Sequence, residues 1–292
     1  MQEPKSHHRI YDYTSIGRPL DPAWPSNKAV LILMPLAAVA GLAISLHKGV
    51  GFLPSLNMAL IYAAVVFGTW ALARELMPDD HISAFISMAL GFTAVLAFPQ
   101  PGLLVLFATL ALLRVINRSS GQAARTRDSI IVTLLVICAV YSSQSPWFGA
   151  VAALTFFLDG ILYKPVKRQW WFALICFGSM VVYIVDHDVK WSGIVAPDSL
   201  LKWLAILAML VFCLHVMLLR KIHSRGDIGH SRLDLRRVKA GAAVVVLATL
   251  QGLAVMPHVI LLVATIGGLC LGIAFRRAFR NPVKKLHKTD LP

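Results

Sequence analysis

Ten apolar runs follow one another along this chain, and no other feature restricts its fold as much. Several of them approach the length of about 20 residues that a helix needs to cross the hydrocarbon core of a bilayer. The runs lie at about 29–46, 56–73, 82–98, 102–117, 129–143, 147–163, 169–185, 199–219, 240–256 and 258–275. They predict an all-α polytopic membrane protein with about ten transmembrane helices.

The composition excludes the main soluble classes. Hydrophobic residues make up 58% of the chain and charged residues 14%, whereas soluble domains have roughly 45–50% and about 25%. A soluble globular enzyme, a disordered chain and a small disulfide scaffold are therefore ruled out. We expect a polar N-terminal tail at 1–27, a transmembrane domain at 28–275 and a basic C-terminal tail at 276–292.

The distribution of Lys and Arg predicts the orientation. With an even number of spans both tails share one side, and of the 28 Lys and Arg residues all but Lys48, Lys190 and Lys202 fall on that side. The positive-inside rule then predicts that both termini are cytoplasmic, in a plasma membrane that we expect to be a bacterial inner membrane. The net charge of +14 is explained by a cytoplasmic rim that faces anionic lipid headgroups, so it requires no nucleic acid partner.

Small residues predict close helix contacts in the first and last runs. They recur every fourth position, a spacing that lets two membrane helices approach closely. These residues are Ala37, Gly41 and Ser45, and Ala264, Gly268 and Gly272.

Asp159 is the one acidic residue that interrupts an apolar run, and Arg114 has a similar place in another run. A carboxylate at membrane depth is costly and usually faces a partner or a wet cavity. We expect the two side chains to form an ion pair or to bracket a cytoplasm-facing pocket. Alternatively, both lie at the inner interface, with Arg114 extended toward the headgroups. His215 is a third candidate for this gate, either as a proton relay or as a polar residue satisfied by a neighbouring helix.

An arginine-rich stretch follows Arg114. Its Asn117, Arg118, Arg125 and Arg127 could hold a phosphate through charge-assisted hydrogen bonds. The positive-inside bias alone also predicts such a loop.

A short duplication marks the predicted cytoplasmic loop at 220–239. His223-Ser-Arg225-Gly-Asp227 recurs seven residues later as His230-Ser-Arg232-Leu-Asp234. If this segment is helical, a step of seven places both copies on one face. His223, Arg225, His230 and Arg232 would then form a docking face for lipid headgroups, a phosphorylated ligand or an acidic protein partner. A solvated linker is the alternative.

Nucleophile-elbow, zinc-protease, phosphate-loop and dinucleotide motifs are absent from the sequence, and we expect neither a cofactor nor a bound metal. The length and expected topology resemble those of drug/metabolite transporters, and this resemblance implies no particular site residues. The leading hypothesis is a transporter or permease for a small polar or amphipathic solute. The alternatives are a membrane-embedded enzyme or flippase acting on a lipid-linked phosphate, and a non-catalytic assembly or scaffold subunit.

Overall fold

The structure, a computed structural model, describes residues 10–98, 101–189, 198–228 and 231–286. Over these residues the chain forms helices and loops and no strand, which confirms the predicted all-α class. A short helix, α1 (Ile10–Tyr13), precedes ten longer helices, and a 3₁₀ turn, η1 (Leu253–Val255), precedes the last of them. The longer helices are α2 (Pro25–His47), α3 (Phe52–Leu76), α4 (His81–Ala97), α5 (Leu103–Asn117), α6 (Thr126–Ser143), α7 (Trp147–Ile161), α8 (Gln169–Asp186), α9 (Leu200–Leu218), α10 (Leu235–Gln251) and α11 (Met256–Leu286).

Helices α2 to α11 correspond one by one to the ten apolar runs, but several helix ends differ. Helix α11 continues to Leu286, eleven residues beyond its run, so it extends into the predicted C-terminal tail at 276–292. The run at 240–256 predicted a helix that starts five residues later than α10 does. Asp234 explains the earlier start, because its carboxylate accepts hydrogen bonds from the backbone N–H groups of Arg236 and Arg237. Such an N-cap satisfies donors that have no partner inside the helix.

Six helical segments are long and apolar enough to cross a membrane. They are α2, α3, α6, α8, α9 and the segment Leu253–Phe279, which comprises η1 and most of α11. Helices α4, α5 and α7 are apolar but shorter, and α10 carries Arg236, Arg237 and Lys239 near its start. Length and composition therefore indicate a membrane-embedded, multi-pass protein.

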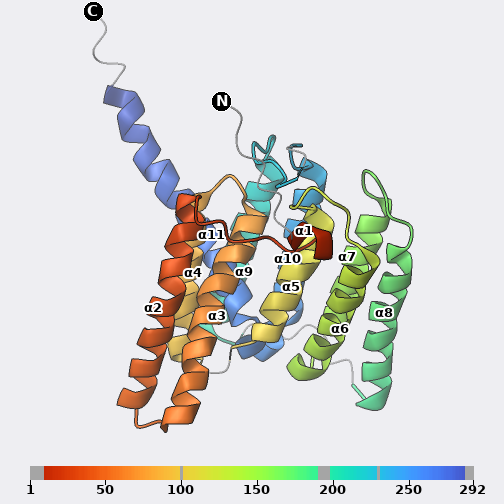
Figure 1. Ribbon diagram of the computed structural model, residues 1–292, viewed down its shortest axis with the longest axis horizontal. Coiled ribbons are helices and arrows are strands. Elements are labelled where there is room, and N and C mark those ends of the chain that lie inside the picture. The colour runs from red at the N-terminus through yellow and green to blue at the C-terminus, as the bar shows by residue number, and fades with distance from the viewer. Residues whose placement is uncertain (1–9, 99–100, 190–197, 229–230, 287–292) are drawn as a thin grey trace, which may run out of the picture.

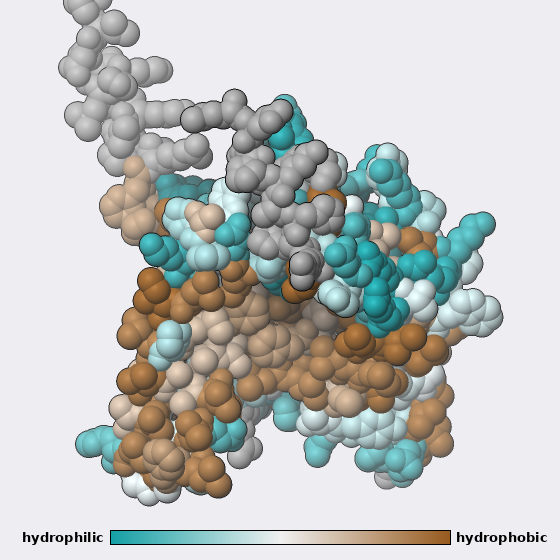
Figure 2. Space-filling model, in the orientation of Figure 1, coloured by the Kyte–Doolittle hydropathy of each residue, from teal (hydrophilic) through white to brown (hydrophobic). Residues whose placement is uncertain are grey.

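The helices form a bundle in which most residues of α5 and of the first part of α11 are buried, whereas Figure 1 shows the C-terminal part of α11 projecting beyond the bundle. Leu106 and Leu113 of α5, and Leu262 of α11, have no exposed surface. The outer helices instead present large apolar side chains outward: Val185 of α8 is 76% exposed and Leu200 of α9 75%. Figure 2 shows hydrophobic side chains over much of the lower part of the visible face and hydrophilic ones gathered at its upper end. An apolar surface of this extent is suited to lipid rather than to water.

The predicted small-residue contacts are confirmed. Ala37, Gly41 and Ser45 are buried on α2, and a Cβ at Gly41 would overlap the ring of Tyr62 on α3. On α11, a Cβ at Gly268 would overlap the backbone of Ser87, and one at Gly272 would overlap that of Ser83. Helices α4 and α11 therefore approach each other too closely for any side chain at these two positions.

The segment at 10–22 crosses one end of the bundle. In Figure 1 it runs from α1, beside the upper ends of α5 and α6, past α3 to the start of α2. Tyr11 is 6% exposed and Ser15 1%. Part of the predicted polar tail is thus packed against the helices, and we call residues 10–22 the N-terminal strap.

Candidate functional site

The charged side chains that pair across the bundle gather at the end covered by the N-terminal strap. Helices α3, α5 and α7 end there, and α10 begins there. Four carboxylates at this end are almost wholly buried, and two of them each contact two arginines: Asp159 has no exposed surface, and Glu75 is 3% exposed, whereas Asp80 and Asp128 are each 2% exposed. A buried carboxylate costs several kcal/mol unless cations and hydrogen-bond donors compensate it, so its partners define the candidate site.

Asp159, in the last turn of α7, pairs with two arginines. Its Oδ1 accepts hydrogen bonds from Arg118 Nε at 3.0 Å and Nη2 at 2.8 Å, and from Arg237 Nη1 at 2.6 Å. Arg237 also donates to the carbonyl oxygens of Ile116 and Tyr163. The Asp159 cluster therefore joins α7, the end of α5 and the start of α10.

The second oxygen of this carboxylate has no partner. Asp159 Oδ2 is buried without a hydrogen bond, and so is Asn117 Oδ1. Buried acceptors are nearly always satisfied, so each of these two atoms could accept a hydrogen bond from a water molecule or from a donor group of a ligand.

Glu75, in the last turn of α3, forms the second cluster. Its Oε1 accepts hydrogen bonds from Arg114 Nε at 3.2 Å, Arg18 Nη1 at 3.3 Å and Ser119 Oγ at 3.1 Å. Arg18 also forms an ion pair with Asp227 at 2.7 Å. The Glu75 cluster thus connects α3 and α5 to the N-terminal strap and, through Arg18, to the loop before α10.

The structure pairs the two predicted gate residues differently from the expectation. Arg114 pairs with Glu75, and Asp159 pairs with Arg118 and Arg237, so the predicted Asp159–Arg114 ion pair is not formed. The cause is local. Arg118 is the C-cap of α5 in the left-handed conformation, with φ 50°, and from there its side chain reaches α7, whereas Arg114 still lies on the helix.

Serine and carboxylate groups fasten the N-terminal strap. Asp128 accepts hydrogen bonds from the backbone N–H, at 2.8 Å, and from the hydroxyl of Ser15. The hydroxyl of Ser120 donates to the Ser15 carbonyl, and the hydroxyl of Tyr11 donates to Asp227. Burial, and the neighbouring Asp227 carboxylate, raise the pKa of Tyr11, so this phenol remains a donor.

The four predicted phosphate-contact residues do not form an open cradle. Asn117 donates to the Glu75 carbonyl, and Arg118 is held by Asp159. Arg125 donates to the carbonyls of Tyr11 and Asp12, and Arg127 to that of Asp12. Two of the four residues are thus part of internal contacts, and the two remaining arginines bind backbone oxygens of the strap.

A cavity of about 270 Å³ lies beneath the strap. Its walls are apolar side chains of α3, α5 and α6, and Arg114 also lines it. Thr14, Ile16 and Gly17 of the strap complete the lining, and Arg114 Nη1 donates to the Ile16 carbonyl at 3.3 Å. One guanidinium thus contacts a buried carboxylate, the strap and the cavity.

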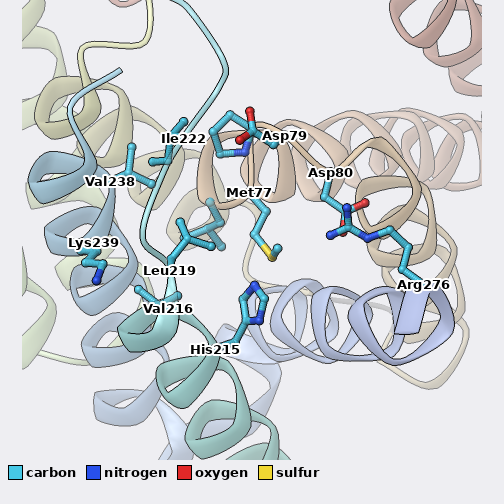
Figure 3. A pocket seen from close by; sticks show the side chains of 12 residues that line it. Met77, Asp79, Asp80, His215, Val216, Leu219, Ile222, Val238, Lys239 and Arg276 are labelled. Carbon is cyan, nitrogen blue, oxygen red and sulfur yellow. The ribbon is translucent and has the colours of Figure 1, made fainter. Parts of the chain in front are cut away.

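His215 lines a second cavity, of about 140 Å³, between α9, α10, α11 and the loop after α3. Figure 3 shows its ring directed toward Met77, with the Asp80–Arg276 ion pair on one side and Lys239 on the other. His215 Nε2 is buried without a partner, so the proposed alternative, a histidine satisfied by a neighbouring helix, is not seen at this atom. Asp159 and Arg114 do not line this cavity.

The duplicated loop is not helical where it is described. Arg225 and Arg232, which occupy matching places in the two copies, form an antiparallel bridge, and Gly226 N donates to the Ser231 carbonyl at 2.9 Å. The two copies therefore face each other as a hairpin and do not share a helical face as predicted. His230 lies outside the described residues.

Asp79, in the loop between α3 and α4, holds this hairpin. Its carboxylate accepts hydrogen bonds at 2.8 Å from the backbone N–H groups of His223 and Ser224, and a further one from the Ser224 hydroxyl. Partial burial opposes ionisation, but these hydrogen bonds outweigh it and hold the pKa of Asp79 below its ordinary value. The contact that His223 makes here is thus a backbone hydrogen bond to Asp79 within the protein.

Glu75, Arg237 and Arg18 are the site residues that the sequence did not single out. Arg74 directly follows an apolar run and Glu75 stands next to it, and this adjacency is the one signal that could have marked Glu75. The described residues contain no group of three or more His, Cys, Asp or Glu side chains placed to hold a metal ion.

No family model matches the chain, and no curated protein or solved structure is similar to it.

Proposed function

We propose that this chain is a transporter or permease for a small polar or amphipathic solute. In this proposal all ten helices, α2 to α11, cross a bacterial inner membrane and both termini are cytoplasmic. The end covered by the strap is then the cytoplasmic end, and its two charged clusters form the gate. Anionic headgroups at the same face would contact the surrounding Lys and Arg side chains.

One observation supports this proposal most directly: Arg114 belongs at once to an ion-pair cluster, to the strap and to a cavity. Its guanidinium contacts Glu75 and the Ile16 carbonyl and lines the space beneath the strap. If the Glu75 cluster separates, the strap loses the contact of Arg18 with Glu75 and that of Arg114 with the Ile16 carbonyl, and the Arg18–Asp227 ion pair remains. The same step would open the cavity and free a cation to bind the solute.

The Asp159 cluster would act as the second part of the gate. It joins α7 to α10 and to the end of α5, so helix movement at this end requires that its ion pairs break or move together. The unpartnered Oδ2 is a free acceptor beside the two arginines, so a donor group of the solute could bind there.

Untargeted mass spectrometry of soluble metabolites and lipid extracts tests the proposal. A deletion strain is compared with its parent and with strains complemented by the wild-type protein, Asp159→Asn or Asp186→Asn. Asp186 is the matched control because its side chain is 68% exposed at the end of α8. Immunoblots verify equal amounts of each protein.

We expect a soluble or amphipathic metabolite to be trapped on one side in the deletion and Asp159→Asn strains and not in the control. Accumulation of a lipid-linked intermediate would instead favour the enzyme or flippase alternative. Unchanged pools in every strain would reject transport and point to the scaffold alternative.

A further inference from the structure

One side of α5 remains partly exposed. Leu104, Phe107, Ala111 and Arg114 are partly exposed, whereas the residues between Phe107 and Arg114, apart from Ala111, are buried. Their spacing of three and four places them in one line along the helix. Most of α5 is enclosed, so this line is where it remains accessible from outside.

Phe107, Ala111 and Arg114 of this line form the floor of the cavity under the strap. Phe67 of α3 stands on one side and Leu135 of α6 on the other. Ala111, with its short side chain, lies between Phe107 and Arg114, so the floor is lowest there. Figure 1 shows α5 between α3 and α6, with the strap crossing near their upper ends. We call this space, from Phe107 to the strap, the α5 groove.

The polar end of the α5 groove is cationic. Arg114 uses Nε and Nη1 for Glu75 and Ile16, and none of the hydrogen bonds found among the described residues involves its Nη2. Arg125 and Arg127 hold the adjacent part of the strap through the carbonyls of Tyr11 and Asp12. No carboxylate within the described part of the chain forms an ion pair with either of them. Neither lines the groove, so their positive charge acts on an anion from beside the strap, and Arg114 is the arginine within the groove.

We propose that the α5 groove binds an amphipath with a single hydrocarbon chain and an anionic phosphate or carboxylate head. The chain would lie over Ala111 between Phe67 and Leu135, and the head would bind Arg114 beside the strap. The apolar walls match a hydrocarbon chain, and guanidinium groups bind phosphate and carboxylate well. The inference names the solute class of the proposed transporter and in that respect rests on the proposed function.

Photochemical labelling tests the site. The full-length protein is placed in nanodiscs of zwitterionic phosphatidylcholine and exposed to dodecyl phosphate that carries a diazirine on its chain. Peptide mapping locates the adducts. The unlabelled competitors are dodecyl phosphate, dodecanoate, dodecyltrimethylammonium and inorganic phosphate. Comparing them distinguishes the contribution of the head from that of the chain, and a phosphate head from a carboxylate head.

Ala111→Phe fills the floor of the groove and leaves Arg114 in place. Its matched control is Ala43→Phe, at an exposed position on α2. We expect adducts within 104–114 in the wild type and in Ala43→Phe, and a loss of about tenfold or more in Ala111→Phe, because a ring would occupy the space of the chain. Dodecyl phosphate or dodecanoate should compete, and the cationic amphipath should not.

Three results would overturn the inference. Equal labelling of the two Phe variants would show nonspecific partition into the bilayer. Equal competition by dodecyltrimethylammonium would show that the site does not require an anionic head. Full competition by inorganic phosphate alone would show that the apolar groove does not contribute to binding. If the adducts appear as expected but the metabolite pools of the Asp159→Asn strain equal those of the wild-type strain, transport is rejected and the binding site is retained. If the metabolite pools change in the Asp159→Asn strain but the adducts do not appear at 104–114, the binding site is rejected and transport is retained.

Discussion

Arg237 Nη1 lies 2.6 Å from Asp159 Oδ1, although 78 residues separate the two in sequence. Both side chains are almost fully enclosed, with exposures of 4% and 0%. This contact holds the start of α10 against the end of α7. The Asp159 cluster is therefore a structural element as well as a candidate gate, and its two roles can be separated by experiment.

Replacing Asp159 by Leu should destabilise the protein, because two buried arginines lose their carboxylate. We expect a loss of about 3–5 kcal/mol in the free energy of unfolding, as for other broken buried pairs. Unfolding in SDS, followed by circular dichroism, measures it. The double variant Asp159→Leu/Arg237→Met should recover part of the loss, and a double variant no more stable than Asp159→Leu would show that the pair is not coupled.

Gly268→Ala should weaken the contact between α4 and α11, since its Cβ would overlap the backbone of Ser87. Overpacking of this kind costs about 1–3 kcal/mol. Gly178→Ala is the matched control, because a Cβ at this helical position meets no atom within 4 Å. The two variants are compared by thermal unfolding in the same detergent, and equal midpoints would contradict the close approach of α4 and α11.

Asp128→Leu should release the N-terminal strap. The carboxylate accepts two hydrogen bonds from Ser15, and its removal leaves buried donors unsatisfied at a cost of about 1–3 kcal/mol each. Hydrogen exchange at residues 11–18 should become faster, as measured by mass spectrometry. Asp12→Asn is the control because the Asp12 side chain is exposed; similar exchange in both variants would argue against this anchor.

The hairpin held by Asp79 should open in acid. Its pKa lies below the ordinary 3.8, so its hydrogen bonds stabilise the folded loop above that pH. This stabilisation is lost as the pH falls below 3.8 and through the lower pKa of the folded state. Exchange of the amides of His223 and Ser224, compared with an unstructured peptide at each pH, should lose its protection over this range. Asp79→Asn should lack this transition, and an identical transition in the variant would assign it to another group.

The helices could be predicted from the sequence because hydropathy is a local property of each run. The contacts at Gly41 and Gly268 were also predictable, since small residues at helical spacing mark a face without further information. Arg114 and Arg118 show the limit. Which of them meets Asp159 depends on the left-handed C-cap at Arg118 and on the position of α10, and neither is encoded by a local pattern.

The N-terminal strap and the hairpin were missed for the same reason. Ser15 and Asp128 are 113 residues apart, and their polar side chains give no periodic signal that links them. The repeat at 223–234 did indicate that two copies are related, but the spacing of seven favoured a helix. The backbone bridge between Arg225 and Arg232 depends on turn geometry and on Asp79, which lies far away in sequence.

The strap also sets an order of events during synthesis of the protein. Arg18 binds Asp227, which is 209 residues later in the chain, and Tyr11 binds the same carboxylate from 216 residues away. When α3 and α5 have already left the ribosome, Asp227 does not yet exist. The strap therefore completes its docking only after α2 to α9 have been made, and until then it can be held over the α5 groove only by contacts with earlier parts of the chain, such as those with Glu75, Ser120 and Asp128.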